Sequence, residues 1–310
     1  MAATTQFRAM LEAGEQVWAP CVYDCLSAKV AELCGHNGLM LSSAELAISM
    51  SGVPDGLISA DEMIWATARI AASSPLPLIV DGENGGGTPL LTYRFCERLI
   101  GAGAQGITIE DSGPHWFAGY DAGEGSVLDA KAWASNIKAA HDALEGSGVV
   151  LIARTNVKGG GTLEKASYID RTLGLEAAIE RCQMGLDAGA DMTLVMDINH
   201  AGCMPEVYAI SERVPGWKMY PDLRADTGEP DVDMDELRGL GFNFVTNHVF
   251  MKGATKGMLE YGRRNAEARS TAYSENDDFG LGHVFHPFTF REWIDRAADF
   301  HAYERELGEP

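Results

Sequence analysis

The chain has 310 residues, of which 46% are hydrophobic and 22% are charged, so it can bury a large core and is not disordered as a whole. Its formal net charge is −21, and no stretch is rich in Lys and Arg, which argues against nucleic-acid or anionic-membrane partners. The N-terminus has no hydrophobic signal core and no apolar run reaches the about 20 residues of a membrane span, so we expect a cytoplasmic protein.

Short apolar segments that predict strands recur along the chain. They are Val17–Ala19, Gly38–Leu41, Leu76–Val80, Gly106–Ile109, Val149–Ala153, Met192–Met196, Trp217–Tyr220 and Phe242–Thr246. Segments with helical spacing lie between them, namely Asp24–Leu33, Ala60–Ala72, Leu90–Gly101, Asp129–Leu144, Gly174–Ala188, Met204–Val214 and Val232–Leu240.

This alternation predicts an α/β fold, a parallel (β/α)₈ TIM barrel. A doubly wound open sheet is the alternative, but no GxGxxG follows the first strand to support it. We assign residues 1–262 to the barrel and 263–310 to a C-terminal helical extension with a helix at Phe290–Leu307. The barrel has already used its eight strands, so we expect this extension to pack on a partner subunit.

The cysteines predict no metal site. Six are scattered through the chain, without a CxxC pair or a close Cys/His cluster, which is typical of buried thiols in a reducing compartment.

Acidic residues follow three neighbouring predicted strands. Asp81 and Glu83 end the third strand in "LIVDGENGGG", Glu110 and Asp111 end the fourth in "GITIEDS", and Asp55 lies in the loop after the second. The carboxyl ends of parallel barrel strands converge on one face, so these carboxylates should meet there. Oxygen ligands without sulfur favour Mg²⁺, with Mn²⁺ as the alternative ion. Each acid alone would be read as a helix cap or a solvated loop residue.

Other polar residues point to the same mouth of the barrel. Arg154 ends the apolar fifth strand and needs an anion, either a structural carboxylate or the carboxylate or phosphonate of a substrate. Ser42 and Ser43 end the second strand, where they bind a second carboxylate or form a plain ST-turn. After the first strand, Asp24 is read as a helix N-cap, and Tyr23 is left undecided.

Two further groups remain open. Asn247 and His248 follow the last strand, and Asp197, Asn199 and His200 follow the sixth; a lone histidine there is more often a hydrogen-bond partner than an acid or base. The long loop from Ser112 to Val127 contains His115 and Trp116 and suits a mobile lid. Its aromatic residues Trp116 and Phe117 either contact a hydrophobic substrate group or anchor the lid.

Together, "VYDCLSAKVAELCG", "SGVPDG", "LIVDGENGGG", "GITIEDS", "LIARTN" and "AIERCQMGLDAGADM" resemble the isocitrate lyase/phosphoenolpyruvate mutase superfamily over about residues 15–260. The resemblance implies a barrel whose last helix is exchanged between subunits of a homotetramer, a dimer of dimers. It also implies Mg²⁺-dependent lyase chemistry on a small anionic 2-oxo or 2-hydroxy carboxylate through an enolate.

The resemblance also implies roles for individual residues. Asp81, Glu83 and Glu110 would surround the metal, and Asp55 would lie near the reacting centre. Arg154, Ser42 and Ser43 would hold the substrate's anionic groups, with Asn247, His248 and Trp116 as further binding residues. The group that transfers the proton stays open among Asp55, Tyr23, His115 and His248.

The sequence departs from the family pattern in two places. The usual "DADTGYG" is "DGENGGG" here, so Glu83 replaces an aspartate and could ligate directly or through water. The lid has "HWFAG" in place of "KRCGH", so Phe117 occupies the position of the lyase cysteine, and the lysine and asparagine of the mutase lid are missing as well. We therefore expect a lyase or decarboxylase. A phosphonopyruvate-type mutase or hydrolase and a non-catalytic metabolite-binding barrel are the alternatives.

Overall fold

The computed structural model describes residues 4–53, 56–113, 127–158, 173–200, 202–223, 232–271, 288 and 290–307. The chain forms two compact units, residues 1–251 and 252–310, which we describe separately. In the described residues, no helix combines the length and the apolar character that crossing a membrane requires.

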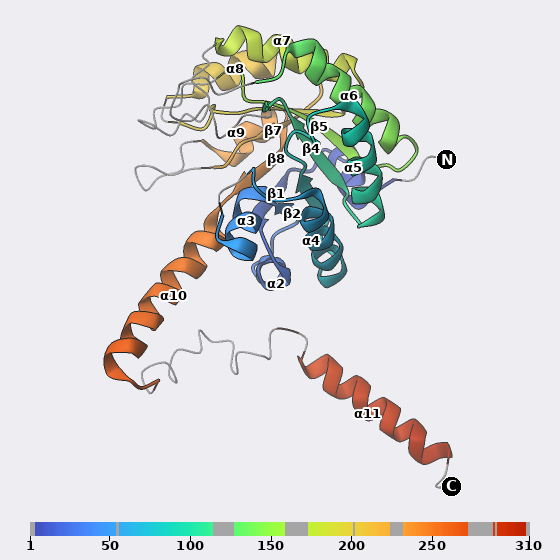
Figure 1. Ribbon diagram of the computed structural model, residues 1–310, viewed down its shortest axis with the longest axis vertical. Coiled ribbons are helices and arrows are strands. Elements are labelled where there is room, and N and C mark those ends of the chain that lie inside the picture. The colour runs from blue at the N-terminus through green and yellow to red at the C-terminus, as the bar shows by residue number, and fades with distance from the viewer. Residues whose placement is uncertain are drawn as a thin grey trace. The chain divides into compact units, whose positions relative to one another are not determined.

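The first unit is a closed barrel of eight parallel strands, which confirms the predicted fold (Figure 1). The strands are β1 (Val17–Val22), β2 (Leu39–Leu41), β3 (Leu78–Asp81), β4 (Gly106–Glu110), β5 (Val150–Thr155), β6 (Met192–Val195), β7 (Trp217–Tyr220) and β8 (Phe242–Asn247). Each strand pairs with the next in chain order, and β8 pairs with β1 to close the barrel, with Pro20 opposite Asn247.

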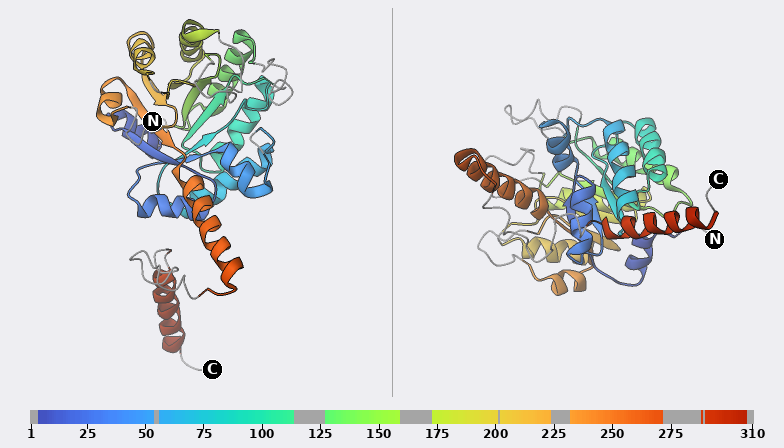
Figure 2. Two further views of the ribbon diagram at one scale, coloured as in Figure 1. Left: turned by 90° about the vertical axis from the view of Figure 1, so that its left-hand side faces the viewer. Right: turned by 90° about the horizontal axis from the view of Figure 1, so that it is seen from below.

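Helices surround this barrel (Figure 2). They are α1 (Gln6–Glu12), α2 (Cys25–Leu33), α3 (Ser43–Ser51), α4 (Ala60–Ser73), α5 (Pro89–Gly101), α6 (Ala130–Leu144), α7 (Gly174–Asp187), α8 (Met204–Arg213) and α9 (Met234–Gly239). The sequence pattern did not predict α1 and α3. Helix α1 inserts Phe7 and Leu11 into the interior cluster of the barrel. The Phe7 ring packs edge-on against the Phe244 ring, with 5.2 Å between the ring centroids.

The alternation of side chains along each strand positions the functional residues. On β5, Val150 and Ile152 lie in the interior cluster, whereas Leu151 and Ala153 pack in the outer layer. Because strand side chains alternate with a period of two, Arg154 continues the inward row and Thr155 the outward row. Inward rows therefore end in polar residues at the carboxyl-terminal mouth.

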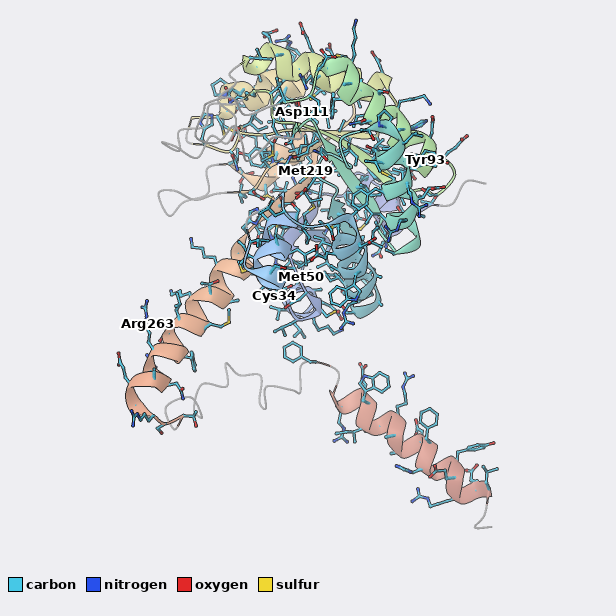
Figure 3. All side chains as sticks on the ribbon, viewed as in Figure 1. Cys34, Met50, Tyr93, Asp111, Met219 and Arg263 are labelled. Carbon is cyan, nitrogen blue, oxygen red and sulfur yellow. The ribbon has the colours of Figure 1, made fainter. Side chains whose placement is uncertain are left out.

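The second unit contains α11 (Phe290–Leu307) and most of α10 (Val249–Ala268), which starts in the first unit. Helix α11 has the predicted bounds, whereas α10 was not predicted. Helix α10 has no buried side chain, as the sticks around Arg263 illustrate (Figure 3). The exchange of a helix between subunits stays a prediction.

Candidate functional site at the carboxyl-terminal mouth

The acids of the β3 and β4 ends lie close together, as the sequence predicted. Asp81 accepts hydrogen bonds from Ser43 Oγ at 3.3 Å, Thr108 Oγ1 at 3.1 Å and the Glu83 backbone N–H at 3.2 Å. The Glu110 backbone N–H donates to the Glu83 carbonyl at 2.7 Å, which joins the two strand ends directly. Asp81 and Glu110 are 9% and 7% exposed, so both carboxylates are almost removed from water.

The loop after β3 has a backbone that few sequences can adopt. Glu83 has φ +47°, in the left-handed region that is uncommon for residues other than glycine. A Cβ atom at Gly82 would lie 2.5 Å from the carbonyl oxygen of Thr108, so only glycine fits there. A strained residue between buried acids is typical of a functional site rather than of a solvated turn.

Arg154 lies between two of these acids. Its Nη1 donates to Asp81 Oδ2 at 3.2 Å, and its Nε lies 2.9 Å from Glu110 Oε2 in an ion pair. Nη2 donates to Asn156 Oδ1 at 3.3 Å. Burial alone would lower the pKa of Arg154, but the Glu110 and Asp81 carboxylates outweigh it and raise the pKa. The sequence predicted that Arg154 needs an anion, and in this structure the carboxylates of Asp81 and Glu110 fill that role.

The charges of the cluster do not balance without a cation. Burial, with added repulsion from Asp81 and Glu110, raises the pKa of Glu83 to about 7. Burial also raises the pKa of Glu110, although Arg154 opposes this. When ionised, the three carboxylates and the single guanidinium of Arg154 leave two negative charges uncompensated. This charge, with donor atoms that are all oxygen, fits a hard divalent cation such as Mg²⁺.

The predicted serines have different surroundings. Ser42 is the N-cap of α3, and its hydroxyl accepts from the Glu45 backbone N–H at 3.3 Å. Ser43 instead donates to Asp81, so it belongs to the acid cluster. Asp24 caps α2 as predicted, in a capping box with Ser27. Tyr23 is half-buried at the end of β1, and burial raises its pKa.

Asp111 is separated from its neighbour Glu110. Its side chain lies in the outer layer, where it accepts from Arg181 Nη1 at 2.9 Å, Thr155 Oγ1 at 2.6 Å and the Asn156 backbone N–H at 2.8 Å. This fully buried and paired carboxylate ties β4 to β5 and α7. It is therefore a structural acid, outside the candidate metal cluster.

Three predicted site residues, Asp55, His115 and Trp116, lie outside the described residues, as does Phe117. Described residues on either side of these segments make the following contacts. Gly56, next to Asp55, donates its backbone N–H to Glu83 Oε1 at 3.2 Å. Ser112 and Val127, at the two ends of the predicted lid, form an antiparallel bridge, and the Ser112 carbonyl accepts from Asn84 at 3.2 Å.

The far side of the mouth holds a group that the sequence did not predict. His248 Nδ1 lies 2.8 Å from Glu45 Oε1, and His248 Nε2 lies 2.8 Å from Asp222 Oδ2 and 3.8 Å from Cys21 Sγ. Burial alone would lower the pKa of this imidazole, but the Cys21 sulfur and the hydrogen bonds to Asp222 and Glu45 outweigh it and raise the pKa. The spacing of cysteines and histidines along the sequence gave no sign of this group, because Cys21 and His248 lie 227 positions apart in the chain and meet only in the fold.

The remaining polar residues at strand ends support loops. Asn199 donates to the carbonyl of Asp222 at 2.8 Å, and the carbonyl of Asp197 accepts from Lys158 at 2.9 Å. His200 Nε2 lies 3.4 Å from Glu206 Oε2. Asn247 is 2% exposed, and its Nδ2 has no hydrogen-bond partner in the described part of the chain.

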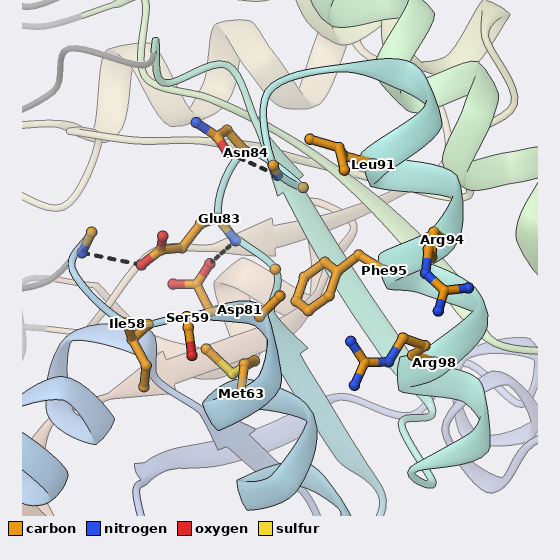
Figure 4. A pocket seen from close by; sticks show the side chains of 15 residues that line it. Ile58, Ser59, Met63, Asp81, Glu83, Asn84, Leu91, Arg94, Phe95 and Arg98 are labelled. Atoms are coloured by element: carbon orange, nitrogen blue, oxygen red, sulfur yellow. Dashed lines mark hydrogen bonds between the residues drawn. The ribbon is translucent and has the colours of Figure 1, made fainter.

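A cavity of about 420 Å³ adjoins the acid cluster on the side of α4 and α5 (Figure 4). Asp81 and Glu83 contribute its acidic end, and α5 contributes Phe95, Arg94 and Arg98. The cavity thus combines carboxylates, arginines and apolar side chains next to the candidate metal cluster.

Comparisons with known proteins show the family of this chain. The family model of phosphoenolpyruvate phosphomutase matches residues 7–261. The chain is 30% identical to the petal death protein of Dianthus caryophyllus, over 96% of this chain and 89% of that protein. It is 32% identical to the chloroplastic carboxyvinyl-carboxyphosphonate phosphorylmutase of Arabidopsis thaliana, over 86% of this chain and 76% of that protein.

A third relative is 2,3-dimethylmalate lyase. The Eubacterium barkeri protein of this name is 26% identical over 95% of this chain and 94% of its own length. A crystal structure of 2,3-dimethylmalate lyase has the same fold, with a TM-score of 0.80 and 24% identity over 96% of this chain and 99% of that chain.

Proposed function

Because the chain belongs to the phosphoenolpyruvate phosphomutase family, within the isocitrate lyase/phosphoenolpyruvate mutase superfamily, we propose that it is a Mg²⁺-dependent carbon–carbon lyase. Its substrate would be a small 2-oxo or 2-hydroxy carboxylic acid, and decarboxylation is included in the reaction class. The observation that carries the proposal is the cluster of Asp81, Glu83 and Glu110 with Arg154 at one mouth of the barrel.

In this proposal the acids hold the ion and other residues hold the substrate. Asp81, Glu83 and Glu110 bind Mg²⁺, or Mn²⁺ as the alternative, and the bound ion supplies a Lewis acid for the negative charge of an enolate. Arg154 binds the substrate carboxylate through its planar guanidinium, and Ser43 provides a hydroxyl beside it. Asp55, Tyr23 and His115 are the proposed proton-transfer groups, and Trp116 a proposed substrate contact.

The names of relatives support a carboxylate substrate. One relative is named as a lyase of 2,3-dimethylmalate and another as a carboxyvinyl-carboxyphosphonate phosphorylmutase. Both names describe small anionic carboxylates, and the oxygen-rich, cation-demanding mouth of this barrel suits the same class.

An assay with a panel of 2-oxo and 2-hydroxy acids tests the proposal. We expect turnover to cease after EDTA treatment and to return on addition of Mg²⁺, with cleavage products identified by mass spectrometry. Turnover that persists after complete metal removal would contradict the proposed role of the acid cluster. If Mg²⁺ and oxalate bind but no panel member reacts, the chain is a metabolite-binding barrel instead.

Phosphorus–carbon chemistry is the second candidate, favoured by 32% identity to a phosphorylmutase. The described site contains Arg154, which suits a phosphonate as well as a carboxylate. Phosphorus NMR of an incubation with phosphonopyruvate separates the two candidates. A new phosphate or phosphate-ester resonance would favour a mutase or hydrolase, whereas an unchanged spectrum with turnover of carboxylic acids would favour the lyase.

A further inference from the structure

We propose that Cys21, Asp222 and His248 form a second metal site, specific for Zn²⁺ or a similar transition metal, at the carboxyl-terminal mouth of the barrel. The three residues come from β1, the end of β7 and the end of β8, which are neighbouring strands. The candidate Mg²⁺ cluster comes from β3, β4 and β5, so the two sites occupy different parts of the mouth.

The ligand atoms have nearly the spacing that a metal ion requires. Cys21 Sγ, Asp222 Oδ2 and His248 Nε2 belong to a group whose potential ligand atoms all lie within 4.8 Å of one another, the one such group in the described residues. The distance of 3.8 Å between Sγ and Nε2 is close to the roughly 3.5 Å expected for tetrahedral bonds of about 2.3 and 2.0 Å. The carboxylate oxygen of Asp222 lies closer to Nε2 than two ligands of one ion would, so it would have to move away by roughly half an ångström.

The surrounding residues already orient these ligands. Glu45 Oε1 lies 2.8 Å from His248 Nδ1. Nδ1 therefore keeps a proton for this hydrogen bond, and Nε2 is the nitrogen that would bind the metal. Thr246 Oγ1 donates to Asp222 Oδ1 at 2.9 Å and leaves Oδ2 for the ion. A carboxylate behind the histidine is the usual second layer of a zinc site. Glu45 is 4% exposed, and its Oε2 has no hydrogen-bond partner among the described residues.

The kinds of donor atom select the metal. One sulfur, one imidazole nitrogen and one carboxylate oxygen suit Zn²⁺ better than Mg²⁺, which prefers oxygen ligands alone. Three protein ligands leave a fourth position for water or a small molecule, as in zinc sites that take part in chemistry. Cys21 is 2% exposed and lies in the interior cluster, whereas the His248 side chain is 44% exposed, so an ion would enter from the histidine side.

The charge of the site is the same with and without the ion. Without metal, both ring nitrogens of His248 face carboxylate oxygens, so both carry a proton. Cys21 is buried and its pKa is raised by that burial, so it is a thiol. Zn²⁺ would displace the Nε2 proton and the thiol proton. The two charges of the ion replace the two charges of these protons, so the net charge around the carboxylates of Glu45 and Asp222 stays the same.

Cobalt titration of the whole protein tests this site, because Co²⁺ replaces Zn²⁺ and gives a near-ultraviolet charge-transfer band when a thiolate binds it. The protein is stripped of metal, given excess Mg²⁺ and titrated with Co²⁺. We expect one equivalent of Co²⁺ to produce the band and Zn²⁺ to abolish it. The acid cluster has no sulfur, so the band reports on this site alone and is independent of the proposed lyase activity.

Variants assign the ligands. Cys21→Ser should abolish the band, whereas Cys34→Ser, which changes an exposed cysteine, should leave it intact. Glu45→Gln should weaken Co²⁺ binding roughly 10- to 100-fold without removing the band. Absence of the band in the unmodified protein, or its persistence in Cys21→Ser, would overturn the proposal. Should Cys21→Ser fail to fold by circular dichroism, Asp222→Asn and the unmodified protein still decide the question.

Discussion

At the scale of residues, the site depends on charges that oppose one another in the absence of metal. Asp81, Glu83 and Glu110 are held together by backbone and hydroxyl donors, and Arg154 compensates only part of their charge. Such a cluster lowers the stability of the metal-free protein and gives a divalent cation a large differential affinity for the folded state. Stability and function therefore make opposite demands on Glu83.

Replacing this glutamate should stabilise the metal-free protein. The pKa of Glu83 rises from 4.5 to about 7 on folding, so the folded state holds more protons in that window and stability falls as pH rises through it. At pH 8 in EDTA, we expect Glu83→Gln to unfold in urea with a free energy roughly 1–2 kcal/mol higher than the unmodified protein. Glu97→Gln, on the exposed face of α5, should change nothing.

In saturating Mg²⁺, we expect the unmodified protein to have the higher free energy of unfolding. It gains the free energy of Mg²⁺ binding, which the Glu83→Gln variant largely loses. A glutamine variant that is stabilised by Mg²⁺ as much as the unmodified protein would show that Glu83 is not part of the metal site.

Arg154 supplies a second test at this scale. Arg154→Lys keeps the positive charge but loses the planar guanidinium group. A substrate carboxylate held by two parallel hydrogen bonds would therefore lose one of them. We expect KM to rise about 10-fold or more in steady-state assays, with a smaller change in kcat. Arg213→Lys, at a surface ion pair with Glu176, is the matched control. An unchanged KM would restrict Arg154 to its pairing with Asp81 and Glu110.

At the scale of elements, the sequence predicted the candidate Mg²⁺ cluster because its residues follow strands directly. Asp81, Glu110 and Arg154 each end a short apolar run, and the topology of a parallel barrel brings such ends together. The group around His248 escaped prediction because Cys21 lies inside a strand and its partners come from the other end of the chain. Only the pairing of β1 with β8 brings them together.

Helices were predicted less completely than strands. The spacing predicted α2 and α4 to α9, whereas α1 is only seven residues long and α3 begins in the serine pair that could equally have formed a turn. Asp55 and the lid residues 114–126 lie outside the described residues, so their predicted roles remain proposals.

The loop between β3 and α5 allows a prediction at the element scale. Gly82→Ala places a Cβ atom 2.5 Å from a backbone oxygen of β4, which cannot move without disturbing the barrel. We expect a loss of about 2–3 kcal/mol in thermal or urea unfolding and weaker Mg²⁺ binding. Gly101→Ala, at the open end of α5 where a Cβ meets nothing within 4 Å, should be neutral or slightly stabilising. Equal effects of the two substitutions would contradict a constrained loop.

At the scale of the whole molecule, a chain of net charge −21 must still attract an anionic substrate. In the proposed function, Arg154 and a bound divalent ion would supply positive charge at the mouth of the barrel and offset the negative field of the whole chain. The helical unit poses a separate question, because α11 exposes Trp293, Phe300, Tyr303 and Leu307 along one stripe. An apolar stripe of this kind needs a cover, and we propose that another subunit provides it.

Sedimentation velocity checks this assembly. We expect the unmodified protein to sediment as a homo-oligomer, a tetramer on the predicted arrangement, and the double variant Trp293→Ser, Phe300→Ser to sediment as a smaller species. The control double variant Arg305→Ser, Glu306→Ser changes the polar side of the same helix and should keep the assembly. A monomeric unmodified protein would exclude the proposed role of α11.

The central claim is that the acids at the ends of β3 and β4 hold a divalent ion that binds the enolate-like form of a substrate. Isothermal titration calorimetry with oxalate, which mimics that form, tests it most directly. We predict that oxalate binds the unmodified protein in the presence of Mg²⁺, and that binding is lost in EDTA and in Asp81→Asn. Oxalate binding of equal strength with and without Mg²⁺, or unchanged binding in Asp81→Asn, would contradict the account.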